Sequence, residues 1–274
     1  MTSLKPMGNI TKVDLITGFL GAGKTTYIKR YIEYFRREGK TFAVIENEYG
    51  MAGIDSMILA ESGVFVRELS GGCICCALKT NFHDVLLSFG GLYDRIIIEP
   101  SGIFDPSDFF MIMESSAVSA VCEYGCMVTV VDPAMEEMMT DDDKSVLAGE
   151  LLNTGKIIQR DEIFALTDDD FAIISNAKPQ KRELTISPVD HTTLFQSCTL
   201  YPNAVFEEDE IPHVANVWRI KGYLKANDGS WLINYAGGSH KPEKINREIT
   251  PMINIIGRRL DRKYLKSLFK IRVK

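Results

Sequence analysis

The sequence predicts an α/β fold, in which a mostly parallel sheet carries helices on both faces and is followed by a small C-terminal α+β domain. Strand-like and helix-like segments alternate over the first 175 residues or so, which is typical of a parallel sheet. Several of the strand-like segments are apolar throughout, as in 95–99 with its three consecutive isoleucines, and such strands are covered on both faces. After about residue 185 the pattern changes to strands joined by short turns.

The individual elements of the first region follow from the spacing of apolar residues. The segment 25–37 places Ile28, Tyr31, Ile32 and Phe35 at helical spacing. A second helix is expected at 81–89, which follows a glycine-rich stretch. The expected strands, which are short runs rich in β-branched residues, are 12–17, 41–45, 63–69, 95–99, 126–131 and 171–175.

The change of pattern predicts two domains, residues 1–185 and residues 190–274, with the boundary between 180 and 195. In the second domain we expect strands at 216–224 and 230–235, joined by a turn at 225–229 that ends in glycine. A further strand is expected at 252–256 and a short basic helix at 261–269.

The composition of the 274 residues narrows the function classes. The chain is 45% hydrophobic, enough to bury a substantial core, and its net charge of −6 argues against a nucleic-acid partner. Its apolar runs are too short to cross a membrane, and Met1 to Thr11 lacks the apolar stretch of an export signal. Three of the six cysteines crowd together, which predicts reduced thiols and a cytoplasmic location rather than a disulfide framework.

A glycine-rich loop from Gly18 to Thr25 fits the pattern G-x-x-x-x-G-K-[ST] and lies between an expected strand and an expected helix. Its amide groups and the positive end of the helix would hold nucleotide phosphates, with Lys24 on the β- and γ-phosphates and the Thr25 hydroxyl on Mg²⁺. The chain is therefore expected to be a nucleoside triphosphatase of the P-loop type. The expected nucleotide-binding residues of this segment are Gly18, Gly21, Ala22, Gly23, Lys24, Thr25 and Thr26.

The buried strand at 95–99 ends in Glu99, and Pro100, Ser101 and Gly102 follow it. A carboxylate at the tip of such a strand lies where a P-loop sheet holds its magnesium ion, and a glycine just beyond can offer its amide to the γ-phosphate. Glu99 is therefore expected to act with Lys24 and Thr25 in hydrolysis and to bind Mg²⁺, and Gly102 to bind nucleotide.

The segment Gly71 to Cys76 holds three cysteines in four residues, Cys73, Cys75 and Cys76. Thiolates are ligands for soft metal ions such as zinc or copper(I). A closed structural zinc site uses four ligands from two separated pairs, and this chain supplies one cluster, so an open and exchangeable metal site is expected. Buried small side chains or a redox pair are the alternative explanations of the cluster.

Four segments together resemble the CobW-like metallochaperone GTPases: Gly18–Thr25, Glu46–Gly50, Gly71–Cys76 and Glu99–Gly102. The resemblance implies that Cys73, Cys75 and Cys76 bind zinc or a similar metal (cobalt, nickel or copper(I)), with Glu48 as a possible carboxylate ligand. It also implies that GTP with Mg²⁺ orders the switch segment Asn47–Gly50 and that hydrolysis releases the metal to a client metalloprotein. The C-terminal region resembles the same family more loosely.

Members of this family usually recognise guanine with an N-K-x-D segment, and this chain departs from that pattern. The nearest candidate in this chain is Asn176, which is followed by alanine where the lysine is usual and later by proline where the aspartate is usual. GTP is therefore expected from the resemblance, with ATP as the alternative.

Other polar residues are expected to have ordinary structural roles. The acidic runs Asp141–Asp143 and Asp168–Asp170 are interpreted as solvated acids of loops or helix starts, not as metal ligands. His83 is interpreted as a surface residue that begins a helix near the cysteines. His191, His213 and His240 stand apart, so the sequence does not predict a histidine-rich metal store.

Three functions from different classes fit the sequence. The first is a switch that couples nucleotide hydrolysis to metal delivery. The second is a metal sensor or regulatory adaptor in which nucleotide sets the conformation and turnover is incidental. The third, a small-molecule kinase, lacks a recognisable arginine-bearing lid segment and leaves the cysteine cluster unexplained. Self-association is open in all three.

Overall fold

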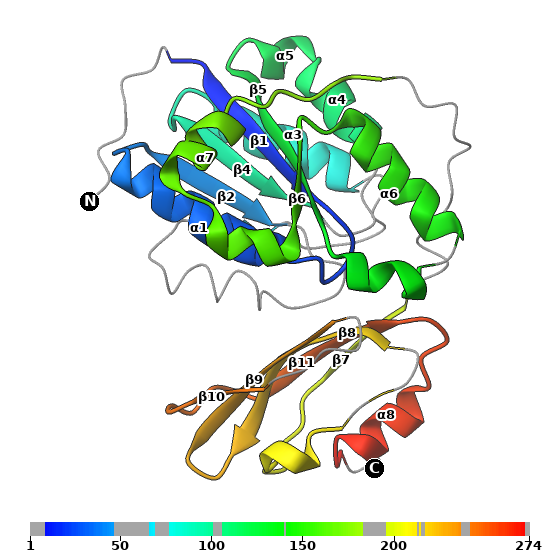
Figure 1. Ribbon diagram of the computed structural model, residues 1–274. Helices are drawn as coiled ribbons and strands as arrows, with labels where there is room; N and C mark the ends of the chain where they lie inside the picture. Colours follow the sequence, from blue (N-terminus) through cyan, green and yellow to red (C-terminus); the bar gives the residue numbers. More distant parts are fainter. Residues whose placement is uncertain are drawn as a thin grey trace. The chain divides into compact units, whose positions relative to one another are not determined.

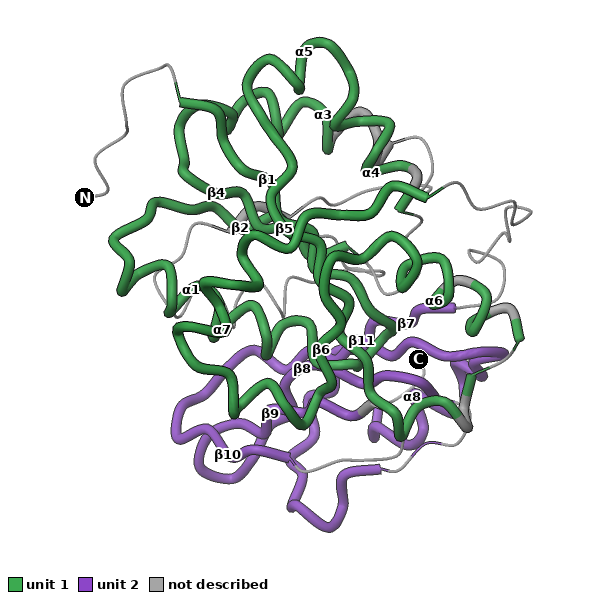
Figure 2. The backbone as a smooth tube through the Cα atoms, turned by 45° about the horizontal axis from the view of Figure 1, so that its top comes forward, with its two compact units in different colours: residues 1–48, 55–189 green, residues 49–54, 190–274 purple. Residues whose placement is uncertain are grey.

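The computed structural model describes residues 9–46, 66–68, 77–100, 106–139, 141–182, 196–212, 214, 217–236 and 242–271. These residues belong to two compact units, one up to residue 182 and the other from residue 196 onwards (Figure 2). The part between 182 and 196, where the sequence predicts the domain boundary, lies outside the described residues.

The first unit is built on a parallel sheet. Among the described residues, six strands pair in the order β3-β2-β4-β1-β5-β6, and each of these pairs is parallel. This confirms the predicted fold class. The strands are β1 (Thr11–Thr17), β2 (Phe42–Glu46), β3 (Val66–Glu68), β4 (Arg95–Glu99), β5 (Cys122–Val131) and β6 (Lys156–Gln159).

Helices connect these strands, and short 3₁₀ turns accompany them. The helices of the first unit are α1 (Lys24–Arg37), α3 (Ala77–Phe89), α4 (Pro106–Met113), α5 (Ser116–Ser119), α6 (Asp141–Asn153) and α7 (Asp168–Ile174). The 3₁₀ turns are η1 (Pro133–Met138) and η2 (Arg160–Ala165).

Alternate residues of the strands face opposite helix layers, as the period of two in a strand requires. In β4, Ile97 packs in a cluster with α1 and α7, whereas Ile96 and Ile98 pack in a second cluster with α3 and α4. Figure 1 shows the two layers, one on each side of the sheet. A strand that is apolar on both faces therefore has a helix layer on each face, as the sequence predicts.

The expected strand at 171–175 is wrong, because these residues belong to helix α7 and its end. Thr167 caps the helix: its hydroxyl accepts the amide hydrogen of Asp170, and the Asp170 carboxylate accepts the amide and hydroxyl hydrogens of Thr167. This reciprocal capping box starts a helix where the apolar run alone suggested a strand. It also shows that Asp168–Asp170 are helix-start acids, as expected.

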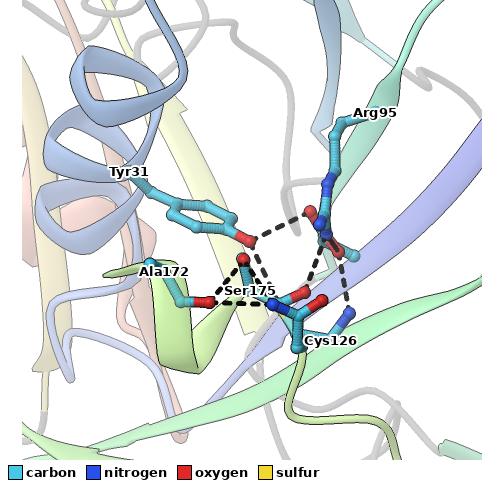
Figure 3. Close-up of polar contacts among 7 residues, drawn as sticks. Tyr31, Arg95, Cys126, Ala172 and Ser175 are labelled. Atoms are coloured by element: carbon cyan, nitrogen blue, oxygen red, sulfur yellow. Dashed lines mark hydrogen bonds and ion pairs between the residues drawn. The ribbon is translucent and has the colours of Figure 1, made fainter. Parts of the chain in front are cut away.

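A cluster of polar groups lies inside the first unit. The buried Asp14 accepts hydrogen bonds from Arg95 Nη1 at 2.7 Å, from the Cys126 amide at 2.8 Å and from the Tyr31 hydroxyl at 3.2 Å. Arg95 Nη1 also donates to the Ser175 carbonyl at 3.0 Å. Figure 3 shows how this cluster joins three strands to helices α1 and α7.

The second unit holds an antiparallel sheet with one helix on it. Among the described residues, five strands pair in the order β10-β9-β8-β11-β7. Leu265 and Phe269, from helix α8 and its end, pack on apolar residues of this sheet. The elements are β7 (Gln196–Leu200), the 3₁₀ turn η4 (Glu208–Glu210), β8 (Val217–Ala226), β9 (Gly229–Ala236), β10 (Glu243–Ile245), β11 (Met252–Gly257) and α8 (Arg262–Leu268).

Candidate functional site

The glycine-rich loop lies between the end of β1 and the start of α1, as its sequence pattern predicts. Gly18 has φ 129°, and a Cβ atom there would lie 2.1 Å from the Val130 carbonyl oxygen. Gly23 has φ 106° and is the residue directly before α1. Both positions therefore require glycine, and the loop directs the chain into the positive end of a fourteen-residue helix.

Lys24 is 4% exposed, and its side chain folds back across the loop. Its Nζ atom donates to the Gly18 carbonyl oxygen at 2.8 Å and to the Phe19 carbonyl oxygen at 3.2 Å. The ammonium charge is thus held inside the loop that would hold phosphates.

Thr25 and Glu99 are brought together at the carboxyl end of the sheet. The Thr25 hydroxyl donates to both oxygens of the Glu99 carboxylate, at 3.1 and 3.2 Å. Glu99 is 6% exposed. A hydroxyl and a carboxylate side by side are hard oxygen donors of the kind that Mg²⁺ prefers, so this pair fits the expected ion.

Glu46 is a candidate that the sequence reasoning missed. It ends β2 directly opposite Glu99 of β4 in the parallel register and is 4% exposed. On its other side it is opposite Glu68 of β3, and the cysteine segment follows β3 in the sequence. An acidic residue at the end of a second buried strand was the available signal, because carboxyl ends of neighbouring parallel strands meet at one edge.

The predicted metal ligands Cys73, Cys75, Cys76 and Glu48 lie outside the described residues, as does Gly102. Within the described ranges, the structure shows no group of three or more metal-ligating side chains. The soft-metal site therefore stays a prediction. Gly21, Ala22 and Thr26 are described and lie in the loop and the first turn of α1.

Asn176 lies just beyond the end of α7 and not after a strand. Its side-chain amide donates to the Ala172 carbonyl oxygen at 2.9 Å. The segment that directly follows the parallel strand β6 is η2, which starts at Arg160. A Cβ atom on Gly23 would lie 3.4 Å from Arg160 Cγ and 3.2 Å from Ile163 Cδ1, so η2 borders the glycine-rich loop.

The remaining sequence candidates have ordinary surroundings. His83 is half-buried on α3, with its Nδ1 atom 3.4 Å from the Asp84 carboxylate. Asp141 begins α6, as expected of a helix-start acid, but Asp143 is 1% exposed, so the expectation that this acidic run is solvated is wrong for that residue. His191, His213 and His240 lie outside the described residues. None of the helices in the described part is long and apolar enough to cross a membrane.

Comparison with known proteins relates the chain to zinc chaperones. The chain is 32% identical over 130 residues to the zinc chaperone YeiR of Escherichia coli K12 and 36% identical over 141 residues to the zinc chaperone CobW of Pseudomonas aeruginosa. These alignments cover 46% of this chain in each case, and 39% and 37% of those relatives. The chain thus spans well under half the length of the curated relatives that it matches.

A solved structure, the Zn(II)-bound YjiA GTPase of E. coli, aligns with 97% of this chain and 100% of its own, at 17% identity and a TM-score of 0.42. The family model described as the nucleotide-binding domain of CobW/HypB/UreG matches residues 12–159. That range is more than half of the 274 residues and contains the glycine-rich loop, Glu46, the cysteine cluster and Glu99. The chain therefore belongs to the CobW/HypB/UreG family.

Proposed function

We propose that this chain is a GTP-hydrolysing metallochaperone, which couples its nucleotide state to the binding of zinc or a similar soft metal and to its delivery to a client protein. The register of β2 and β4 carries this proposal. It places Glu46, next to the expected switch segment, directly beside Glu99, which holds Thr25. A change at the magnesium position can therefore pass from Glu99 to Glu46 on the neighbouring strand, and from there to the segment that follows β2.

On the nucleotide side, the roles follow from the described contacts. Lys24 would exchange its two carbonyl partners for the β- and γ-phosphates. Thr25 and Glu99 would hold Mg²⁺, which supplies charge neutralisation at the phosphates. Gly102 is proposed to contact the γ-phosphate.

For the base, the end of β6 and the start of η2 are a better candidate than Asn176. Gln159, Arg160, Asp161 and Glu162 offer an amide, a base and two acids in the order of the N-K-x-D pattern. Arg160 borders the phosphate loop, whereas Asn176 follows helix α7. We therefore propose GTP as the nucleotide, read by η2.

On the metal side, the thiolates of Cys73, Cys75 and Cys76 are proposed to bind zinc, with Glu48 or Glu46 adding a carboxylate. Thiolate ligands favour zinc, while cobalt, nickel and copper(I) are the alternatives. Relatives support this choice. One that is 35% identical over 130 residues is the "Zinc-regulated GTPase metalloprotein activator 1" of Schizosaccharomyces pombe.

The zinc affinity, measured by competition with a chromophoric chelator, tests the proposal. We expect a change of about tenfold or more between the nucleotide-free and Mg-GTP-bound protein, because metal and nucleotide binding are reciprocally coupled. Mg-ATP should produce less change. The triple variant Cys73→Ser, Cys75→Ser, Cys76→Ser should lose tight zinc binding. Cys198→Ala, which removes a buried thiol of the second unit, should not.

Three other outcomes of these measurements would contradict or change the proposal. Unchanged zinc affinity in the triple variant would place the metal site away from the cysteine cluster. Zinc binding that responds to neither nucleotide would contradict the coupling, and the chain would be a nucleotide hydrolase with an independent metal site. Coupling that persists when hydrolysis is blocked, together with a client that needs no turnover, would favour the sensor or adaptor.

A further inference from the structure

A buried carboxylate that the proposed mechanism does not use lies beside the phosphate loop. Glu150, in the last turn of α6, is 1% exposed. Its carboxyl group accepts a hydrogen bond from the backbone amide of Gly18, the first residue of the loop. Helix α6 packs on β5, the strand whose Val130 carbonyl oxygen closes the other side of Gly18. Glu150 therefore contacts the loop at a residue that has no room for a side chain.

Only part of this carboxyl group is hydrogen-bonded. Its Oε1 atom is buried and has no hydrogen-bond partner among the described residues. A buried carboxylate usually has each of its oxygens bonded, because an unpaired one carries a large desolvation penalty. An incomplete set of partners is the pattern expected of a group that responds to a ligand.

Lys24 is the charged group that acts on Glu150. Burial raises the pKa of Glu150 to about 8, although the positive charge of Lys24 and the hydrogen bond from the Gly18 amide both lower it. Lys24 thus donates to two loop carbonyl oxygens, and its positive charge also acts on the carboxyl group of Glu150.

We propose that Glu150 is a positioning residue of the phosphate loop, which holds the Gly18 amide and competes with bound phosphates for the Lys24 ammonium group. This inference rests on the proposed function, since it assumes that nucleotide phosphates bind at Lys24. An ionised Glu150 neutralises Lys24 and repels the phosphates, whereas a protonated Glu150 does neither.

The consequence is a pH-dependent affinity for nucleotide. Because phosphates favour the neutral carboxyl group, nucleotide binding takes up a proton wherever free Glu150 is ionised. With a pKa of about 8, the dissociation constant should rise about tenfold between pH 7 and pH 9 through this group alone, by proton linkage. The affinity therefore falls as the pH rises through the pKa of Glu150.

The surroundings of Glu150 support this assignment. Among the described elements, α4 and β5 have the most extensive contacts with α6. The titratable side chains described on them and on α6 itself are Asp108, Cys122, Glu123, Tyr124, Cys126, Asp141, Asp143 and Lys144. Among the groups that shift the pKa of Glu150, Lys24 is the one that carries a charge. The pH dependence should therefore report on the Glu150–Lys24 pair.

The test measures the dissociation constant of a fluorescent GDP analogue with Mg²⁺ at pH 7, 8 and 9, for the wild type and for Glu150→Gln. The glutamine keeps the shape of the side chain and an oxygen for the Gly18 amide, but it cannot ionise. The ratio of the wild-type constant to the variant constant should rise about tenfold from pH 7 to pH 9. Titration of the nucleotide itself is common to both proteins and cancels. Asp141→Asn, at the exposed start of the same helix, should keep the wild-type profile.

A second measurement needs no variant. Calorimetry of the wild type at pH 8 in two buffers of different ionisation enthalpy should show uptake of a fraction of a proton per nucleotide. A pH-independent ratio, or no proton uptake at pH 8, would overturn the role of Glu150 while nucleotide binding itself stands. Equal weakening by Glu150→Gln at every pH would show a purely structural contact. Absence of nucleotide binding in the wild type at every pH would instead contradict the proposed function.

Discussion

Two buried charge clusters of the first unit differ in how completely their groups are paired. In the Asp14–Arg95 cluster, both carboxylate oxygens accept hydrogen bonds, and the guanidinium lies over the Phe35 ring at 5.1 Å. In the Lys24–Glu150 cluster, one carboxylate oxygen has no hydrogen-bond partner among the described residues. The first cluster joins β1, β4 and β5 to two helices (Figure 3), and the second lies at the phosphate loop.

This difference separates charges that fix the fold from charges that respond to a ligand. A buried polar network with every partner in place specifies one arrangement, since any change leaves a group unpaired. An incomplete set can improve its energy by binding or losing a charge. The comparison therefore predicts large stability effects at Asp14–Arg95 and large functional effects at Lys24.

Replacement of Arg95 should give the largest effect on stability. Arg95→Met leaves the charge of Asp14 buried without a counter-ion, which should lower the free energy of unfolding by about 3–5 kcal/mol. Urea denaturation followed by circular dichroism measures this. The pKa of Asp14 is already raised, first by burial and against the attraction of Arg95. The loss of Arg95 should therefore cost more stability at neutral pH than below the ordinary pKa of an aspartate.

The double variant Asp14→Asn, Arg95→Met is the matched control. It removes both charges, so it should be more stable than Arg95→Met alone at neutral pH. A loss below about 1 kcal/mol in Arg95→Met, the size of an exposed ion pair, would contradict the view that this cluster fixes the fold.

Replacement of Lys24 should change activity and leave the fold in place. Lys24→Ala removes the cation that would stabilise the phosphates, and the hydrolysis rate should fall by about 10²–10³-fold, as for the loss of one transition-state donor. Phosphate release with Mg-GTP measures the rate, and circular dichroism checks the fold. Lys40→Ala, at an exposed position after α1, is the control. Wild-type turnover in Lys24→Ala would remove the assignment of the phosphate loop.

The sequence predicts those parts of the fold and site that depend on neighbours along the chain. The glycine-rich loop combines its backbone requirements and its lysine within eight residues, so Gly18–Thr25 could be recognised directly. Glu99 was found because it ends a strand of three isoleucines. The prediction for 171–175 is wrong because its apolar residues fit a strand, while the signal for a helix lies in Thr167 and Asp170.

The sequence offers no signal for Glu150 and only a weak one for Glu46, an acid at the end of a strand, because the neighbours of both residues are distant in the chain. Glu46 acquires its position from the register of β2 against β4, and Glu150 acquires its position from the packing of α6 beside the phosphate loop. In both cases glutamate is a common residue type, and only its neighbours in the folded protein indicate a functional role. The roles of Cys73, Cys75 and Cys76 rest on the sequence, since these residues lie outside the described ranges.

Substitution in the capping box of α7 should give the smallest loss of stability. It tests whether complete hydrogen bonding or burial determines how much stability a polar cluster contributes. Thr167 and Asp170 are fully paired with each other but exposed. Thr167→Ala should therefore lower the free energy of unfolding by only about 1 kcal/mol, as for other N-cap residues, because water replaces the lost bonds.

The Thr167 hydroxyl and amide lower the pKa of Asp170, so the stabilisation by this capping box should be present above the ordinary aspartate pKa and be lost as the pH falls through the lowered value. Asp169→Asn, a neighbouring acid outside the capping box, should change little. A loss as large as that of Arg95→Met would mean that complete pairing alone, without burial, determines how strongly a polar cluster holds this fold.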